Sequence, residues 1–136
     1  MEKSPHPFRL RLCKSRRVVV KVGSGVLTGA DHRLNRTRVA SLVQGLSSLV
    51  ERGIQAILVT SGAVATGAPV MGLAGRAKTI PQKQACAAIG QALLMALYEE
   101  LLASRGHHSA QILLTQEDVR DRERYLNARN TFETLL

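Results

Sequence analysis

Apolar residues in this chain fall into short continuous runs separated by longer stretches with helical spacing. Each short run is rich in β-branched or aliphatic residues and is followed by polar or glycine residues, which is typical of a strand and the turn after it. The first run, RVVVKV, is continuous enough to predict a strand buried on both faces. The predicted strands are 17–22, 54–60 and 109–115.

The stretches between and after these runs predict helices, because their apolar residues recur every three or four positions. Asn35 or Thr37 can cap the start of the first helix, and Gly53 can close its end. Pro81 suits the first turn of a long, alanine-rich helix that Gly106 ends. The predicted helices are 39–50, 64–71, 81–105 and 124–136. Thr115 and Asp118 form a capping arrangement that begins a further helical segment.

The alternation of strands with long helices predicts the fold class. It favours an α/β protein with a mainly parallel sheet covered by helices on both faces, that is, a three-layer αβα sandwich. Three strands make a thin sheet, and the apolar pair at 135–136 continues a helical pattern. We therefore expect residues 17–136 to be the N-terminal part of a larger, truncated domain, preceded by a basic flexible tail over 1–16.

Composition and charge narrow the classes of function. The chain has 136 residues, 45% of them apolar, which is typical of a globular protein, and no apolar run approaches the roughly 18 residues of a membrane span. The net charge is +9, but the first 17 residues carry +5 of it. With 3% aromatic residues and no Trp to stack on bases, the sequence argues against nucleic-acid binding.

The two cysteines, Cys13 and Cys86, lie far apart, and no cluster of Cys and His has the spacing of metal ligands. We therefore expect neither a metal site nor a disulfide. Two lone thiols fit a reducing compartment, and the tail lacks the apolar segment of a secretory signal. The sequence predicts a cytoplasmic protein.

Ligands of open parallel sheets bind beyond the carboxyl ends of the strands, so the residues there are the candidates for chemistry. After the first strand, Lys21 is followed by Gly23, Ser24 and Gly25, a lysine and backbone N–H groups that can bind a phosphate. A strand-end lysine followed by a tight turn, with no bound phosphate, is an equally good interpretation of these residues. A P-loop is excluded because its lysine follows the glycines, and the glycine spacing does not fit a dinucleotide site.

After the second strand, Ser61, Gly62 and Ala63 offer a hydroxyl and N–H donors that can bind a carboxylate. Simple N-capping of a helix by Ser61 is the more common use of such a serine. After the third strand, the arginines at 120, 122 and 124 alternate with acidic residues. They can grip an anion, but alternating charges favour a solvated helix face.

Four segments together resemble the amino-acid kinase family. They are VVVKVGSGVLTG (18–29), LVTSGAVATG (58–67), KQACAAIGQALLM (83–95) and QILLTQEDVRDRERYLNARNT (111–131). They occur in the order and spacing of the family and span nearly the whole chain beyond the tail. The last segment and the KVGS opening are similar to those of the members that phosphorylate glutamate.

The resemblance implies transfer of the γ-phosphoryl group of ATP to the side-chain carboxylate of L-glutamate, the first step of proline biosynthesis. Lys21 would act as the catalytic, phosphate-binding lysine, with Gly23, Ser24 and Gly25 around the ATP phosphates. Ser61, Gly62 and Ala63 would bind glutamate. Mg²⁺ would be held through the ATP phosphates, with no metal site on the chain itself. Feedback inhibition by proline and homo-oligomerisation of the full-length enzyme are further expectations.

The chain also departs from the family pattern. Gly25 stands where the family has a small hydroxyl residue or alanine, and the nucleotide lobe is absent from these 136 residues. We therefore expect a fragment that contains the glutamate-binding lobe and is inactive alone. Two alternatives remain open: a non-catalytic binding or assembly module derived from a kinase, and, less favoured, a small nucleic-acid binder suggested by the basic charge.

Overall fold

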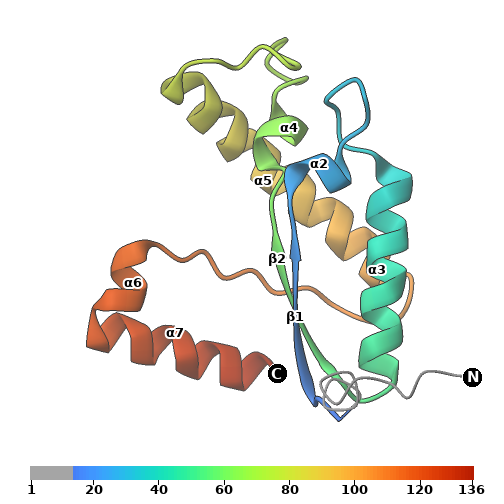
Figure 1. The fold of residues 1–136 in the computed structure, drawn as a ribbon, viewed down its shortest axis with the longest axis vertical. Helices are drawn as coiled ribbons and strands as arrows, with labels where there is room; N and C mark the ends of the chain where they lie inside the picture. The colour runs from blue at the N-terminus through green and yellow to red at the C-terminus, as the bar shows by residue number, and fades with distance from the viewer. Residues whose placement is uncertain (1–13) are drawn as a thin grey trace, which may run out of the picture.

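The computed structural model describes residues 14–136, and the predicted tail over 1–16 lies almost entirely outside the described residues. The chain forms an α/β arrangement in which long helices flank a pair of central strands (Figure 1). The α/β class predicted from the sequence is confirmed. The elements are β1 (Arg17–Val22), α2 (Ser24–Leu27), α3 (Arg36–Glu51), β2 (Gln55–Thr60), α4 (Ala63–Gly67), α5 (Ile80–Ala103), α6 (Gln116–Arg120) and α7 (Arg122–Leu135).

β1 and β2 pair in parallel, and helix α3 makes the crossover between them. The register runs without a slip from Arg17 opposite Gln55 to Val22 opposite Thr60. Both strands therefore end at the same level of the sheet. The loops that follow Val22 and Thr60 leave the sheet side by side, which places the two sequence-predicted candidate segments next to each other.

The hydrophobic core lies on one face of the sheet, where α3 and α5 cover it (Figure 1). Along β1 the side chains alternate between this face and the opposite one, so Val20 and Val22 point into the core. On β2, Leu58 packs against the same core. The buried cluster consists of Val22, Leu27, Val39, Val43, Leu94 and Tyr98.

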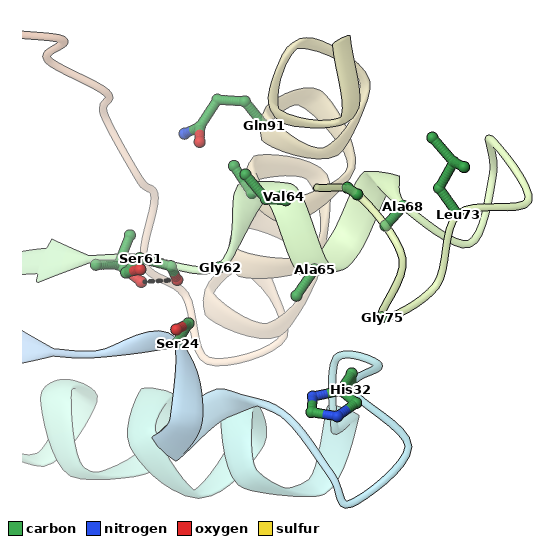
Figure 2. Close-up of a pocket in the computed structure, with 13 residues that line it drawn as sticks. Ser24, His32, Ser61, Gly62, Val64, Ala65, Ala68, Leu73, Gly75 and Gln91 are labelled. Atoms are coloured by element: carbon green, nitrogen blue, oxygen red, sulfur yellow. Dashed lines mark hydrogen bonds between the residues drawn. The ribbon is translucent and has the colours of Figure 1, made fainter. Parts of the chain in front are cut away.

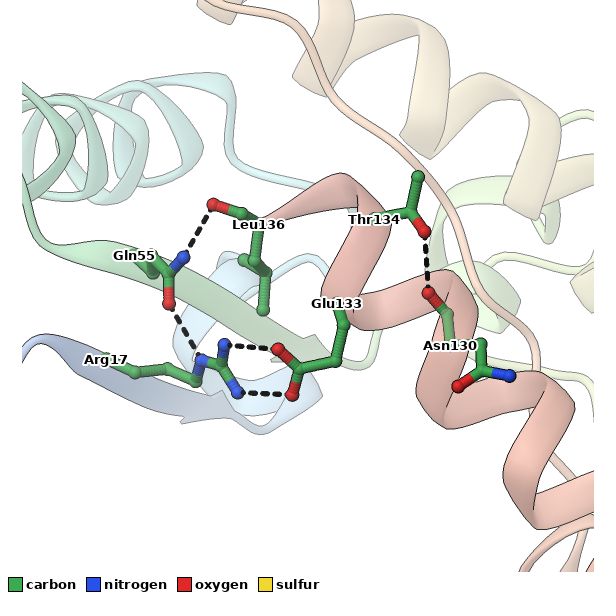
Figure 3. A network of polar contacts seen from close by, with 6 residues as sticks. All are labelled: Arg17, Gln55, Asn130, Glu133, Thr134 and Leu136. Carbon is green, nitrogen blue, oxygen red and sulfur yellow. Dashed lines mark hydrogen bonds and ion pairs between the residues drawn. The ribbon is translucent and has the colours of Figure 1, made fainter.

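Helix α7 lies across the opposite face of the sheet and is tied to the strand starts by a polar network (Figure 3). The Arg17 guanidinium donates to both carboxylate oxygens of Glu133 at 3.1 Å. Its Nε donates to the Gln55 side chain at 2.9 Å, and Gln55 in turn donates to the carbonyl oxygen of Leu136. The ion pair with Arg17 lowers the pKa of Glu133.

The prediction that β1 is buried on both faces is wrong for this chain. Val19, on the α7 side, is 60% exposed, because a cavity lined by Val19, Ile57 and the apolar side of α7 separates the helix from the sheet. Arg120 of α6 and the arginines at 122 and 124 of α7 are solvent-exposed, as the interpretation of a solvated helix face expected.

The predicted third strand over 109–115 is not formed. Within residues 14–136 the sheet contains β1 and β2 alone, and 110–115 runs without a strand partner. Leu113 is 74% exposed. The apolar pattern of this segment is strand-like, but a strand requires a hydrogen-bonded neighbour, and neither β1 nor β2 pairs with it.

Helix boundaries follow the local signals closely. Of the two proposed caps for α3, Asn35 is the one used, since its side chain accepts from the backbone N–H of Arg38 at 3.1 Å. Gly53 follows α3 with φ of 74°, the conformation predicted from its position. Helix α4 ends at Gly67, shorter than the predicted 64–71, because Pro69 has no N–H to continue the helix.

Helix α5 has 24 residues and, among the described helices, is the one long and apolar enough by composition to cross a membrane. It is not a continuous apolar run, because Lys83, Gln91 and Glu99 interrupt it. One helix of this kind is weak evidence for a membrane span, since the core helix of a soluble domain has the same length and composition. Here Leu94 and Tyr98 of α5 lie in the core, and Pro81 occupies its first turn as predicted.

The end of α5 is held by Glu99, which accepts hydrogen bonds from the segment after the helix. Its carboxylate lies 2.7 Å from Nδ1 of His108 and accepts from the backbone N–H and hydroxyl of Ser109 at 2.8 and 2.7 Å. These hydrogen bonds lower the pKa of Glu99 from 4.5 to about 2, and the bond with His108 has the largest effect. The carboxylate form is therefore favoured by folding.

We predict that Glu99→Gln removes a pH-dependent part of the stability. A carboxyl group whose pKa is lowered by folding stabilises the protein above its unfolded pKa of 4.5, and this contribution disappears as the pH falls through about 2. Thermal unfolding of the parent and the variant, followed by circular dichroism from pH 2 to 7, should show a Tm difference above pH 5 that vanishes at the acid end. A Tm difference that is constant with pH would contradict this.

Candidate functional site

The first candidate segment begins at Lys21, whose side chain extends from the end of β1 over the loop that follows. A Cβ atom added at Gly23 would lie 3.7 Å from the Nζ atom of Lys21, so the ammonium group sits directly beside this glycine. Lys21 is solvent-exposed and has no ion-pair partner among residues 14–136. An accessible, uncompensated ammonium group next to a glycine backbone is suited to binding an anion.

Helix α2 starts directly after Gly23 and holds Ser24 at the end of the sheet. Arg38, from the first turn of α3, donates to the carbonyl oxygen of Thr28 at 2.6 Å and reaches those of Gly25 and Val26 at 3.5 Å. It thereby fixes the loop that carries Ser24. Sequence reasoning missed Arg38 because nothing in the spacing links it to a loop ten residues earlier.

The second candidate segment leaves β2 through a glycine in an unusual conformation. Gly62 has φ of 120° and ψ of −5°, which side-chain-bearing residues rarely adopt, and it is buried. It is the N-cap residue of α4, without a side-chain cap. The alternative reading of Ser61 as an N-cap is therefore wrong: Gly62 is the N-cap residue, and the exposed Ser61 side chain accepts no capping hydrogen bond.

These two segments line one pocket at the carboxyl ends of the strands (Figure 2). Ser24 lies across from Ser61, Gly62 and Ala63, and the cavity measures about 520 Å³, within the usual range for small-molecule sites. The pocket lining does not include the sequence neighbours of Ser24 that were predicted with it, namely Lys21, Gly23 and Gly25. The structure therefore brings Ser24 and Ser61 together at one pocket, whereas Lys21 lies outside the pocket, near the end of β1.

Two polar residues that sequence reasoning missed also line this pocket. Gln91 approaches it from α5, and His32 approaches it from the loop before α3 (Figure 2). His32 has a positive φ of 58° and packs beside Gly75 from the segment after α4. A glutamine within a helical pattern carries no signal of its own, since only tertiary packing shows which face of the helix meets the cavity.

The strand end beneath the pocket is fixed by a partly buried hydrogen bond. The Thr60 hydroxyl lies 2.8 Å from the hydroxyl of Tyr98, which is 3% exposed, and Thr60 also donates to the carbonyl oxygen of Ser61. Burial raises the pKa of Tyr98, so this phenol stays protonated. No group of three His, Cys, Asp or Glu residues within 14–136 is arranged to hold a metal ion.

A profile of the amino acid kinase family matches residues 16–136, nearly all of the chain. The chain belongs to the amino acid kinase family. The match includes both candidate segments and the helices that position them, so the pocket at the strand ends is part of an amino acid kinase fold.

Relatives in this family are named glutamate 5-kinase. The protein of Geobacter metallireducens is 53% identical over 92% of this chain, and those of Moorella thermoacetica and Myxococcus xanthus are each 48% identical over 94% of it. In each case the match covers 34% of the relative. The chain spans about a third of the length of these curated relatives.

We predict that Gly62→Ala destabilises the protein, because a Cβ atom is strained at a φ of 120°. The loss should be about 1–3 kcal/mol in chemical unfolding. Gly45→Ala is the matched control: it lies inside α3, a Cβ there meets nothing within 4 Å, and alanine favours a helix. A Gly62 variant as stable as the control would contradict the strained conformation.

Proposed function

We propose that this chain contributes the glutamate-binding part and a phosphate-binding part of a glutamate 5-kinase. The reaction is transfer of the γ-phosphoryl group of ATP to the side-chain carboxylate of L-glutamate, which gives L-glutamyl 5-phosphate and ADP. The observation that carries the proposal is the pocket that joins Ser24 to Ser61–Gly62–Ala63, with Lys21, which has no ion-pair partner among residues 14–136, close to the neighbouring Gly23. The relatives named glutamate 5-kinase support this assignment.

Lys21 is proposed as the catalytic residue that neutralises charge on the transferred phosphoryl group. Phosphoryl transfer depends on positioning and electrostatic stabilisation much more than on covalent chemistry by the protein. Lys21 suits this role because its Nζ lies over Gly23 and has no carboxylate partner among the described residues. Gly23, Ser24 and Gly25 would bind phosphate oxygens through backbone N–H groups and the Ser24 hydroxyl.

Ser61, Gly62 and Ala63 are proposed to bind glutamate. The Ser61 hydroxyl is exposed at the pocket and is not used as a helix cap, and the first turn of α4 supplies N–H donors. The acceptor carboxylate is already an anion, so the reaction requires no general base. Its oxygen forms the new P–O bond as the bond to the leaving ADP oxygen breaks.

Mg²⁺ is proposed to be bound through the ATP phosphates, where it neutralises their charge. The donor set fits this arrangement, because the strand-end segments offer a lysine, serines and glycines and no carboxylate ligands. Inhibition by proline, assembly into a homo-oligomer and a cytoplasmic location remain proposals that follow from the same family assignment.

We predict that Lys21→Met, made in the enzyme expressed from its complete coding sequence, lowers kcat by about 100-fold or more. The change removes a charge that stabilises the transition state. Turnover is measured as ATP-dependent formation of glutamyl hydroxamate. Lys14→Met, an exposed lysine before β1, is the control and should leave kcat unchanged. Normal turnover of the Lys21 variant would refute the role.

Ser61→Ala should chiefly raise the KM for glutamate. A hydrogen bond to a charged group contributes about 1.5–3 kcal/mol, which corresponds to a rise of roughly 10- to 150-fold. Steady-state kinetics with each substrate varied in turn separate the two KM values, and Ser48→Ala, exposed on α3, serves as the control. A rise in the KM for ATP with that for glutamate unchanged would show that the role is misassigned.

A further inference from the structure

Helices α4 and α5 approach each other so closely that their backbones touch. A Cβ atom added at Gly90 of α5 would lie 1.8 Å from the carbonyl oxygen of Ala63 and 2.5 Å from the backbone nitrogen of Gly67. A Cβ atom added at Gly67 would lie 1.9 Å from the carbonyl oxygen of Cys86. The two glycines therefore face each other across the contact, and neither position has room for a side chain.

This contact bears directly on the candidate site, because Ala63 is both the partner of Gly90 and the first residue of α4. Helix α4 has five residues, too few to be a stable helix by itself, so its position depends on packing. The surface on which it packs is α5, whose buried residues recur every four positions along one stripe: Cys86, Gly90, Leu94 and Tyr98.

The same stripe fixes the strand end on the other side of Ser61. Tyr98, two turns after Gly90, holds the Thr60 hydroxyl at 2.8 Å, and Thr60 donates to the carbonyl oxygen of Ser61. The turn from Ser61 to Ala63 is thus held at both ends by one rigid helix. Gly90 contacts Ala63, the last residue of the turn, and Tyr98 contacts Thr60, the residue before the turn.

We propose that Gly90 and Tyr98 are positioning residues that set the geometry of the glutamate-binding turn without touching the substrate. This inference rests on the proposed function. Since a Cβ atom essentially never lies closer than 3.0 Å to a non-bonded heavy atom, a side chain at Gly90 requires α4 and α5 to move apart by roughly 1 Å, which displaces Ala63 relative to α5. A misplacement of about 1 Å can reduce the efficiency of an enzyme by as much as 100-fold.

The test is a comparison of KM values in variants of the enzyme expressed from its complete coding sequence. Gly90→Ala should raise the KM for glutamate by about 10-fold or more and leave the KM for ATP within about twofold. Tyr98→Phe, which keeps the packing and loses one hydrogen bond, should raise the KM for glutamate by about threefold. Both KM values are measured well below the Tm of each variant.

The KM split separates positioning from a general loss of structure. A destabilised enzyme has a smaller active fraction and a lower apparent kcat, but its folded molecules keep the parent KM. Gly45→Ala and Tyr125→Phe are the matched controls, because a Cβ at Gly45 meets nothing within 4 Å and Tyr125 is 48% exposed. Both controls should leave the two KM values unchanged.

Ser61→Ala in the same experiment distinguishes the two possible failures. If Ser61→Ala raises the KM for glutamate while folded Gly90→Ala does not, the positioning role of Gly90 is overturned and the site assignment stands. If Gly90→Ala does not fold, Tyr98→Phe decides, and an unchanged KM for glutamate overturns the inference. If Ser61→Ala itself has no effect on this KM, the assignment of the glutamate site fails, and the inference fails with it.

Discussion

The parallel, in-register pairing of β1 and β2 is the constraint on which the candidate site depends. It brings Val22 opposite Thr60, so two loops that are separated by a helix in the sequence begin at the same edge of the sheet. An antiparallel pairing would place the loops at opposite ends, and a shift of one residue would turn the core side chains of one strand outward. The crossover helix α3 makes the parallel arrangement possible, and its buried residues form the core beneath the two strands.

Helix α5 connects this sheet edge to the pocket. Its buried stripe packs against the core at Leu94 and against α4 at Gly90, and its Gln91 lines the cavity. One helix therefore contributes to stability, to the placement of the Ser61 turn and to the wall of the site. The absence of side chains at Gly67 and Gly90 is what permits this arrangement, because two helices with ordinary side chains pack with their axes about 8–10 Å apart.

The two faces of the sheet differ in how completely they are covered. On the core side, α3 and α5 bury Val22, whereas α7 on the opposite side leaves Val19 largely exposed and is tied to the strand starts by the exposed Arg17–Glu133 pair and the Gln55–Leu136 hydrogen bond. Exposed ion pairs contribute little to stability. The pocket lies beyond the ends of the strands on the well-packed side, which gives its walls a rigid support.

Much of the local structure follows from the sequence alone. The β-branched runs predict β1 and β2, and Asn35, Gly53, Pro81 and the Thr115–Asp118 cap mark helix ends where the structure has them. These signals are local: a cap or a strand run depends on residues a few positions away. The rule that ligands bind at the carboxyl ends of parallel strands also indicates Ser24 and Ser61, and these two residues line one pocket.

Only the tertiary structure decided the features that depend on contacts between residues far apart in the sequence. The strand-like segment 109–115 has no paired strand among the described residues, so its pattern does not become a strand. Gln91 and His32 line the pocket, and Arg38 holds the first loop, because of where three separate elements pack. The contact between Gly67 and Gly90 likewise cannot be predicted from the sequence. A helical glycine is required there because the backbone of another helix packs against it, and only the tertiary structure shows that backbone.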